Sequence, residues 1–270
     1  MARMIAQSKI IAYHTELQAA LLAALKVADK KLFGSIQFRP MPEAGVLQVS
    51  ALNATSTFVA SVPLEMCDVV DQRDEIFETP LSEASVLARF PIKLPKGDDD
   101  ATAQSGLIIS DSWIQITDET GLGIGIRHAR VRRNSEIEMP GSPARTIEQA
   151  HEMPAAWDSE IYPDQMDLAG RVAAIMGQKC ELRPLDVGQT ALSRILVIGS
   201  TYGMTITEGR RENGAEEGDG DSAPGPDDQP LNFDDDGSGS GTVAPDSGSD
   251  FLKSGTGIHI VRSTPPEGAS

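Results

Sequence analysis

Hydrophobic residues recur at two different spacings along the first 207 residues of the chain. Between residues 14 and 32 they return every three or four positions, at Leu17, Leu21, Leu25, Ala28 and Leu32. This period places them on one face of an α-helix that packs on a core. Small and basic residues fall on the other face, at Ala19, Ala23, Lys26 and Lys30. Gly34 is expected to end this helix, because glycine tolerates the left-handed conformation that follows a last turn.

Shorter segments in which apolar and polar residues alternate follow this helix. They cover residues 36–39, 46–51 and 57–62, and a fourth, after a polar loop, covers 75–78. Alternation with a period of two is typical of half-buried β-strands. The connections between the first three are too short for parallel crossovers, so we expect an antiparallel meander.

A second helix is predicted over residues 81–90. Thr79 supplies an N-cap and Pro80 a first-turn proline, while Val86, Leu87 and Phe90 face inward. Strands are then expected at 107–110, 113–117 and 122–128, joined by polar turns. The order predicted so far is one helix, four strands, a second helix and three strands.

The remaining pattern repeats part of this order. Residues 131–157 are rich in proline, methionine and polar side chains, and we interpret them as a connector with a short helix near 146–152. A helix over 164–177 and strands at 180–187, 192–200 and 204–207 then repeat the second half of the first unit. We therefore expect a domain at 1–130, a shortened copy of it at 131–207 and a tail at 208–270.

The tail holds most of the chain's acidity. Residues 208–270 carry 14 acidic and 4 basic residues, a net charge of −10, whereas the other 207 residues carry 26 and 19, a net charge of −7. Gly, Asp, Glu, Ser and Pro dominate this segment, which cannot bury enough apolar surface to offset its ordering entropy. We expect it to be disordered. The late apolar cluster at 251–252 and 258–261 is either a strand that docks back or a partner-binding segment.

Several classes of function are not supported by the residue types present. Cys67 and Cys180 are far apart and predict two buried thiols, not a disulfide or zinc site. The four histidines lack metal-ligand spacing, and the glycines at 121–125 are not followed by a helix that could hold phosphate. No stretch approaches the about 20 apolar residues of a membrane span. We expect a cytoplasmic, non-catalytic protein without metal or cofactor, in which Trp113 and Trp157 are core or interface anchors and not base-stacking platforms.

The order of helices and strands resembles one domain of the DNA sliding-clamp family. The segments LQVSALNATSTFVASVPL and EIFETPLSEASVLARFP carry the resemblance, which covers residues 16–128 as a domain and 160–207 as a half-domain. It implies an α+β fold of antiparallel sheets with helices on one face, in which several domains close around duplex DNA. It also implies a homo-oligomeric processivity factor that binds DNA non-specifically and accepts a DNA polymerase or clamp-binding peptides.

A protein that slides on DNA must attract phosphates without reading bases, which requires Lys and Arg on the helices that face the hole. Basic residues occur on or beside all three predicted main helices. The predicted DNA-facing residues are Lys26, Lys30, Lys31, Arg89, Lys93, Lys96, Arg171 and Lys179. Ordinary solvated helix faces would also carry such residues.

Two features separate the chain from a complete clamp. Residues 131–157 lack a convincing first helix and strands, which leaves the number of domains in the chain open. Two domains per chain would form a trimeric ring. One and a half domains per chain would form an unusual oligomer or remain a monomer. The shortened form and the tail suggest a viral, phage-like member. Within the tail, Gln229, Leu231 and Phe233 match the peptides that dock on bacterial clamps, so a replication or repair accessory protein is the main alternative. A β-rich assembly protein of a virion is a third.

Overall fold

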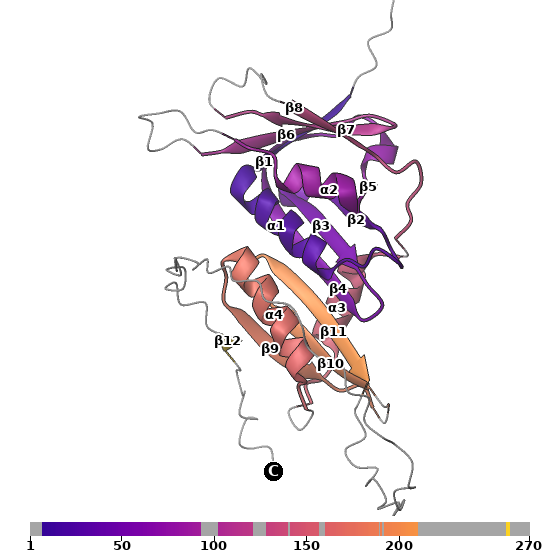
Figure 1. The fold of residues 1–270 in the computed structure, drawn as a ribbon, viewed down its shortest axis with the longest axis vertical. Helices are drawn as coiled ribbons and strands as arrows, with labels where there is room; N and C mark the ends of the chain where they lie inside the picture. The colour runs from indigo at the N-terminus through magenta and orange to yellow at the C-terminus, as the bar shows by residue number, and fades with distance from the viewer. Residues whose placement is uncertain are drawn as a thin grey trace, which may run out of the picture. The chain divides into compact units, whose positions relative to one another are not determined.

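The computed structural model describes residues 7–92, 102–120, 128–139, 141–156, 160–188, 190, 192–209 and 258–259. All of them belong to one compact unit, which spans residues 1–210 and 256–270 (Figure 1). The remaining part of the chain, residues 211–255, lies outside the described residues. The predicted division of residues 1–207 into two domains stays a prediction.

Strand β4 (Ser56–Asp68) links two groups of strands into one network. Its last residues pair with β1 (Ser8–Tyr13), and the order continues through β6 (Gln104–Ile109) and β7 (Trp113–Asp118) to β8 (His128–Arg132). All these pairings are antiparallel. We refer to β1, β6, β7 and β8 as the first sheet.

The first part of β4 belongs to the second sheet. There it pairs with β3 (Val46–Leu52) and with β11 (Tyr202–Gly209), again antiparallel. Strand β3 leads to β2 (Ser35–Met41) and β5 (Phe77–Pro80), and β11 leads to β10 (Leu192–Ile198) and β9 (Cys180–Leu185). The two-residue strand β12 (Ile258–His259) pairs in parallel with β9, which favours the docking interpretation for that part of the late apolar cluster. Short 3-10 helices cover Pro42–Ala44 and Gln72–Asp74.

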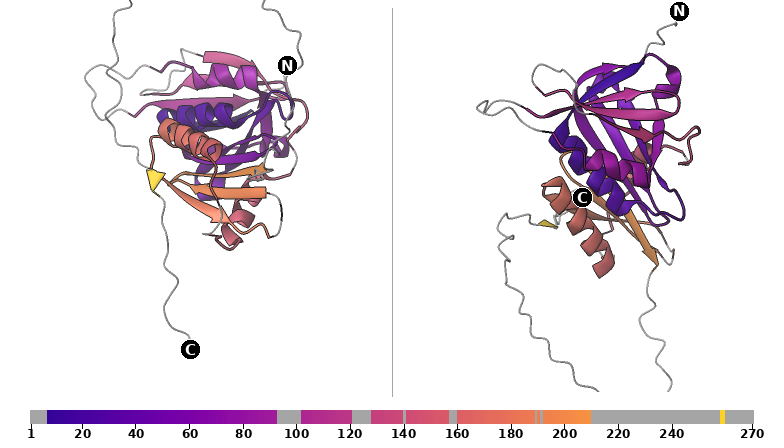
Figure 2. Two further views of the ribbon diagram at one scale, coloured as in Figure 1. Left: turned by 60° about the horizontal axis from the view of Figure 1, so that its bottom comes forward. Right: turned by 45° about the horizontal axis from the view of Figure 1, so that its top comes forward.

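Three helices lie side by side on one face of the strands. Helix α1 (His14–Val27) contacts both α2 (Leu81–Ala88) and α4 (Pro163–Met176), and Figures 1 and 2 show it between the other two. Their inward side chains join one core with the residues of β4 that point the same way, among them Phe58 and Ala60. The antiparallel α+β fold predicted from the sequence is thereby confirmed.

The fourth helix, α3 (Pro143–Glu152), covers the opposite face of the second sheet. Its Ile147 and Ala150 pack with Val59 of β4 and Leu196 of β10, in a cluster separate from the main core. Because successive strand residues point to opposite faces, Val59 and Leu196 lie on the side away from Phe58 and Ile195. The short helix predicted near 146–152 is therefore present, but it begins at Pro143, where Ser142 caps it, and it is not on the face of the other three.

Helix α1 is shorter than the sequence predicted. It ends at Val27, whose carbonyl accepts a hydrogen bond from the Asn53 side chain at 2.7 Å. The Asp29 side chain then accepts from the backbone N–H of Lys31 at 2.9 Å, a local turn that competes with further helix. Lys30 and Lys31 consequently follow the helix instead of lying on it. Leu32, predicted in the core, is 53% exposed, and Ala23, predicted on the outer face, is fully buried.

Other elements also differ from the prediction. Strand β1 was not predicted, because its six residues stand beside a helix pattern and alternate only weakly. Strand β8 continues to Arg132, beyond the predicted end at 128, and its Val131 is buried as its alternation requires. The residues from 121 to 127, also predicted as strand, lie outside the described part of the chain.

A buried ion pair joins β8 to the loop before β5. The guanidinium of Arg133 pairs with Asp74, and both side chains are 8% exposed. Ser8 also donates to Asp74, at 2.6 Å, and Arg133 donates to the Ser110 carbonyl at 3.0 Å. Two buried charges are tolerated here because each is compensated by the other and by further hydrogen bonds.

We expect Asp74→Asn to destabilise the protein by about 3–5 kcal/mol, because it leaves the Arg133 cation buried without its partner. Chemical denaturation followed by circular dichroism measures this free energy of unfolding. Asp111→Asn is the matched control, since Asp111 is exposed and pairs with the exposed Arg73. Equal stability of the two variants would contradict a structural role for the buried pair.

Stability should also depend on the protonation of His14 at the start of α1. Its Nδ1 lies 2.7 Å from the hydroxyl of the fully buried Ser105, and burial lowers the pKa of His14 below its ordinary 6.5, although Asp118 opposes the shift. The unfolded chain therefore takes up a proton more readily than the folded one. We expect a free energy of unfolding that is constant above about pH 7.5 and decreases as the pH falls through 6.5. His14→Gln should remove this decrease, whereas His128→Gln, at an exposed site, should retain it.

Candidate nucleic-acid interface

The helical face is built by burial of one side of each helix and exposure of the other. On α1, Leu17 and Leu21 are buried and Lys26, in the last turn, is exposed. Helix α2 buries Leu87 and is followed by the exposed Arg89. The three adjacent helices therefore offer one solvent-facing surface, which we call the helical face.

Two predicted residues meet in one hollow on this face. Lys30 and Arg89 both line a cavity of about 550 Å³ between the end of α1 and helix α2. The other lining residues are small, apolar or hydroxylic, and none is acidic: Leu25, Ala28, Gly34, Pro80, Leu81, Ser82 and Ser85. Neither cation forms an ion pair with a described carboxylate. The hollow therefore presents two uncompensated positive charges beside two hydroxyls, a combination that suits a phosphate group.

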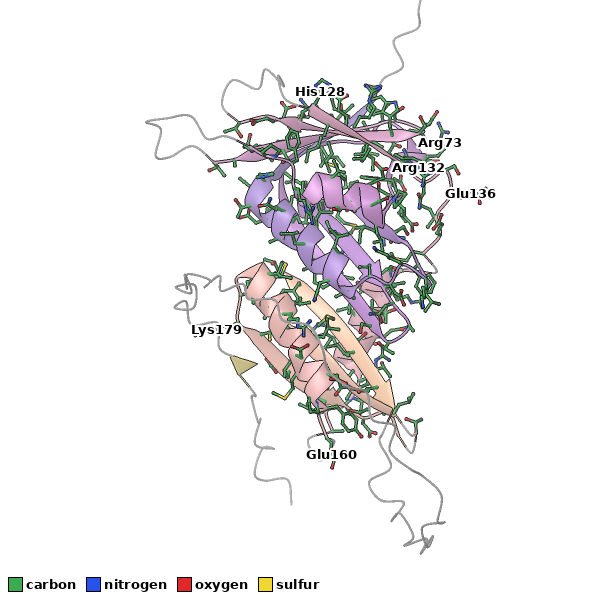
Figure 3. All side chains as sticks on the ribbon, in the orientation of Figure 1. Arg73, His128, Arg132, Glu136, Glu160 and Lys179 are labelled. Carbon is green, nitrogen blue, oxygen red and sulfur yellow. The ribbon has the colours of Figure 1, made fainter. Side chains whose placement is uncertain are left out.

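The other predicted cations differ in their surroundings. Arg171 of α4 is exposed, but its Nε donates to Asp167 at 2.9 Å, one helical turn away, so its charge is largely compensated. Lys179 follows the left-handed Gly177 that ends α4, is exposed and forms no ion pair within the described residues (Figure 3). Lys26 and Lys31 are likewise exposed and form no such pair.

The helical face also carries exposed carboxylates. Glu16 lies in the first turn of α1, and Asp164 and Asp167 in the first part of α4. Because negative side chains are favoured near helix N-termini, these positions are explained by the helix dipole. Among the predicted DNA-facing residues, four of the five described uncompensated cations, Lys26, Lys30, Lys31 and Arg89, lie towards the end of α1 and beside α2, and the fifth, Lys179, follows α4.

Five predicted site residues lie outside the described part of the chain. They are Lys93 and Lys96, which follow α2, and the tail residues Gln229, Leu231 and Phe233. Their assignments stay predictions.

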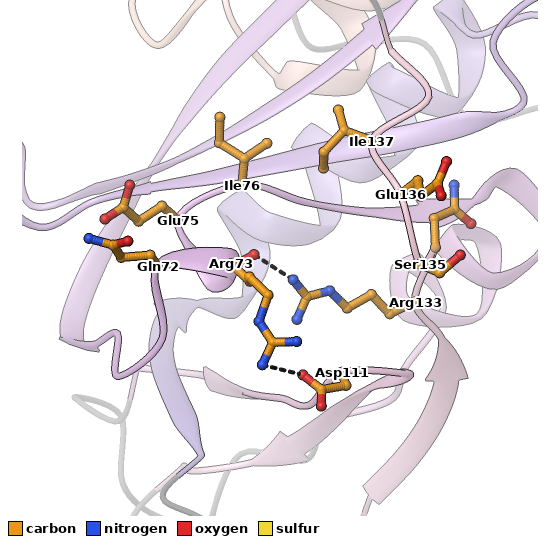
Figure 4. Close-up of a pocket in the computed structure, with 10 residues that line it drawn as sticks. Gln72, Arg73, Glu75, Ile76, Asp111, Arg133, Ser135, Glu136 and Ile137 are labelled. Carbon is orange, nitrogen blue, oxygen red and sulfur yellow. Dashed lines mark hydrogen bonds and ion pairs between the residues drawn. The ribbon is translucent and has the colours of Figure 1, made fainter.

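A second hollow, on the side of β5 and β8, was not predicted. It has a volume of about 470 Å³ and is lined by Arg73, Asp111, Arg133 and neighbouring residues (Figure 4). Its cations are already compensated: a hydrogen bond from Arg73 holds the pKa of Asp71 at about 2, and Arg133 binds Asp74. The sequence contained no signal for this cluster, because Asp74 and Arg133 are separated by 59 residues and belong to no motif. The hollow is thus less suited to an anion than the one lined by Lys30 and Arg89.

The described residues contain no group of three or more His, Cys, Asp or Glu side chains placed to hold a metal ion. No helix among them combines the length and the apolar character that crossing a membrane requires. Of the two thiols, Cys180 is buried as predicted and Cys67 is half-buried.

Comparison with known proteins relates the chain to one group of solved structures. No protein-family model matches it, and no curated protein matches it. Its fold is similar to that of the Helicobacter pylori β clamp bound to a DNA ligase peptide, with a TM-score of 0.47 and 8% identity over 77% of this chain and 68% of that one.

Two further bacterial proteins give similar values. They are the β subunit of DNA polymerase III from Thermotoga maritima, with a TM-score of 0.46 and 11% identity over 74% of this chain, and the Pseudomonas aeruginosa sliding clamp bound to griselimycin, with 0.46 and 10% over 78%. The match spans 64% of the Thermotoga maritima chain and 67% of the Pseudomonas aeruginosa chain. The chain thus corresponds to about two thirds of the length of these clamps.

Proposed function

We propose that the protein is a non-catalytic DNA tether of the sliding-clamp kind, a processivity factor that holds duplex DNA along its helical face. The observation that supports this most is the hollow in which Lys30 and Arg89 stand uncompensated, with no acidic lining residue. Lys26, Lys31 and Lys179 add exposed positive charge beside the same helices. Phosphate attraction of this kind depends on charge and not on base sequence.

The small number of uncompensated cations on the helical face fits a sliding protein. Each phosphate neutralised contributes a salt-dependent term to the affinity, and a handful of cations per chain gives weak binding at physiological salt. Weak contacts allow movement along the duplex, so retention must come from enclosing the DNA. We therefore propose a homo-oligomer that surrounds the duplex. A polymerase or another protein with a clamp-binding peptide would be its partner.

A second candidate function follows from the tail. Gln229, Leu231 and Phe233 match the short peptides that dock on bacterial clamps, and they stand in an otherwise polar segment. In that case the protein would be an accessory factor that binds another clamp through this peptide. A monomer in solution that binds a clamp through residues 229–233 would favour this alternative.

Comparing retention of the protein on circular and on linear DNA tests directly whether it encloses the duplex. If the protein encloses DNA, it should remain bound to a nicked circular plasmid during gel filtration at moderate salt and leave the plasmid once it is linearised, because the ring slides off the ends. Light scattering on the same sample gives the oligomeric mass. Equal release from both forms of DNA, together with a monomeric mass, would exclude enclosure.

Removing one positive charge from the hollow on the helical face tests whether this hollow contacts a phosphate of the duplex. Arg89→Gln should weaken binding to a random-sequence duplex and reduce the slope of log affinity against log salt by about 1, because one phosphate contact is lost. Arg145→Gln is the matched control, since Arg145 is exposed on α3, which covers the opposite face of the sheet. Fluorescence anisotropy at several salt concentrations measures both variants, and equal effects would argue against the helical face.

Removing a carboxylate from the same face should have the opposite effect. Asp167→Asn frees the Arg171 guanidinium, so duplex affinity should rise and the salt slope should become steeper by up to about 0.9. Glu136→Gln makes the same change of charge on the exposed segment that follows β8 and should have a smaller effect. An unchanged affinity for Asp167→Asn would mean that α4 does not approach DNA.

A further inference from the structure

The outer face of the first sheet carries an aromatic and basic surface that the tether does not use. Ile114, Ile116 and Val131 point into the core and are at most 2% exposed. Because neighbouring strand residues alternate, the residues between and beside them point outward, away from α1 and α2. On β7 these are Trp113, Gln115 and Thr117, and on β8 they are His128, Arg130 and Arg132. Thr117 is nevertheless buried, and its hydroxyl donates to the Glu119 side chain at 2.7 Å.

Strand register brings these side chains together in cross-strand pairs. Trp113 lies opposite Arg132, Gln115 opposite Arg130 and Thr117 opposite His128. On the neighbouring strand β6, the half-buried Ile108 lies opposite Gln115. We call the surface formed by Ile108, Trp113, Gln115, His128, Arg130 and Arg132 the Trp113 face.

One arginine of this face lies over the indole ring of Trp113. The Arg130 guanidinium carbon lies 4.1 Å from the centre of the Trp113 ring, and its Nη2 donates to the Gln115 side chain at 3.2 Å. Trp113 was predicted to be a core or interface anchor; it is half-buried, so it is not a core residue, and the interface alternative stays a prediction. The guanidinium and the indole are thus already held together in the free protein, which lowers the ordering cost of binding a ligand to them.

The charge of the Trp113 face is positive. None of its six residues is acidic, while Arg130, Arg132 and His128 are all exposed. Two carboxylates lie beside this face. Glu119, next to Thr117, is 8% exposed and is compensated by Lys9 at 3.1 Å, and Glu83 accepts a hydrogen bond from the backbone N–H of Arg132 at 3.2 Å. A ligand on this surface therefore meets uncompensated guanidinium groups beside an aromatic ring.

We propose that the Trp113 face binds single-stranded nucleic acid. An aromatic ring beside arginines suits unpaired bases, which can stack on planar groups while their phosphates contact the cations. The bases of a duplex are stacked on one another, so their ring faces are not available to a flat sheet. The occupant is therefore expected to be a displaced or unpaired strand, held on a different surface from the duplex.

Binding of a fluorescein-labelled 12-nucleotide oligothymidylate to the full chain, measured by anisotropy, tests this inference. Trp113→Leu should weaken binding at least about five-fold, whereas Trp113→Phe, which keeps an aromatic ring, should retain most of it. Arg132→Gln should reduce the salt slope by about 0.7, the value per phosphate for single strands. Circular dichroism melting of each variant separates lost binding from lost folding.

A second set of measurements separates this surface from the helical face. Arg89→Gln should weaken duplex binding and leave oligothymidylate binding unchanged. Arg132→Gln should weaken oligothymidylate binding and leave duplex binding unchanged. In a Trp157→Phe background, oligothymidylate should quench the fluorescence of Trp113, because a base stacks near it. Wild-type affinity for oligothymidylate in folded Trp113→Leu and Arg132→Gln variants would overturn the proposal. Displacement of the oligonucleotide by polyglutamate at equal charge concentration would also overturn it, by assigning the face to an acidic protein partner.

Discussion

Backbone pairing along strand β4 is the constraint on which the rest of the structure depends. Its first residues are bonded to β3 and β11, and its last residues to β1, so it belongs to both sheets. The same strand points Phe58 and Ala60 towards the helices α1, α2 and α4, and Val59 towards α3. Because each backbone N–H and C=O within a sheet must find a partner, the register of β4 decides where β1, β3 and β11 lie, and the other strands pair outward from these three.

Burial and compensation of charge divide the ionic groups into two kinds. Asp74 and Arg133 are buried and paired, and they hold the end of β8 against the loop before β5. Lys30, Arg89 and Arg132 are exposed and form no ion pair with a described carboxylate. Groups of the first kind contribute to folding, whereas those of the second kind gain little for stability and are free to attract phosphates.

The two proposed nucleic-acid surfaces have different physical characters. The helical face presents scattered cations and a hollow with hydroxyl groups, which suits the regular phosphates of a duplex without reading its bases. The Trp113 face presents an arginine over an indole on the outer side of a sheet, which suits unpaired bases. A protein with both surfaces would hold the two kinds of strand that occur together where a duplex is being opened or copied.

The sequence by itself determined the secondary structure of most of the chain and its antiparallel α+β class, because hydrophobic periods of two and 3.6 residues are local properties. Tertiary structure decided where α1 ends, since its last carbonyl is bonded by Asn53 from the turn between β3 and β4. It also decided that Lys30 and Arg89 share a hollow, that Asp167 compensates Arg171 and that Trp113 lies under Arg130. The type of a residue predicts which charge it carries, but only its neighbours in space decide whether that charge is compensated.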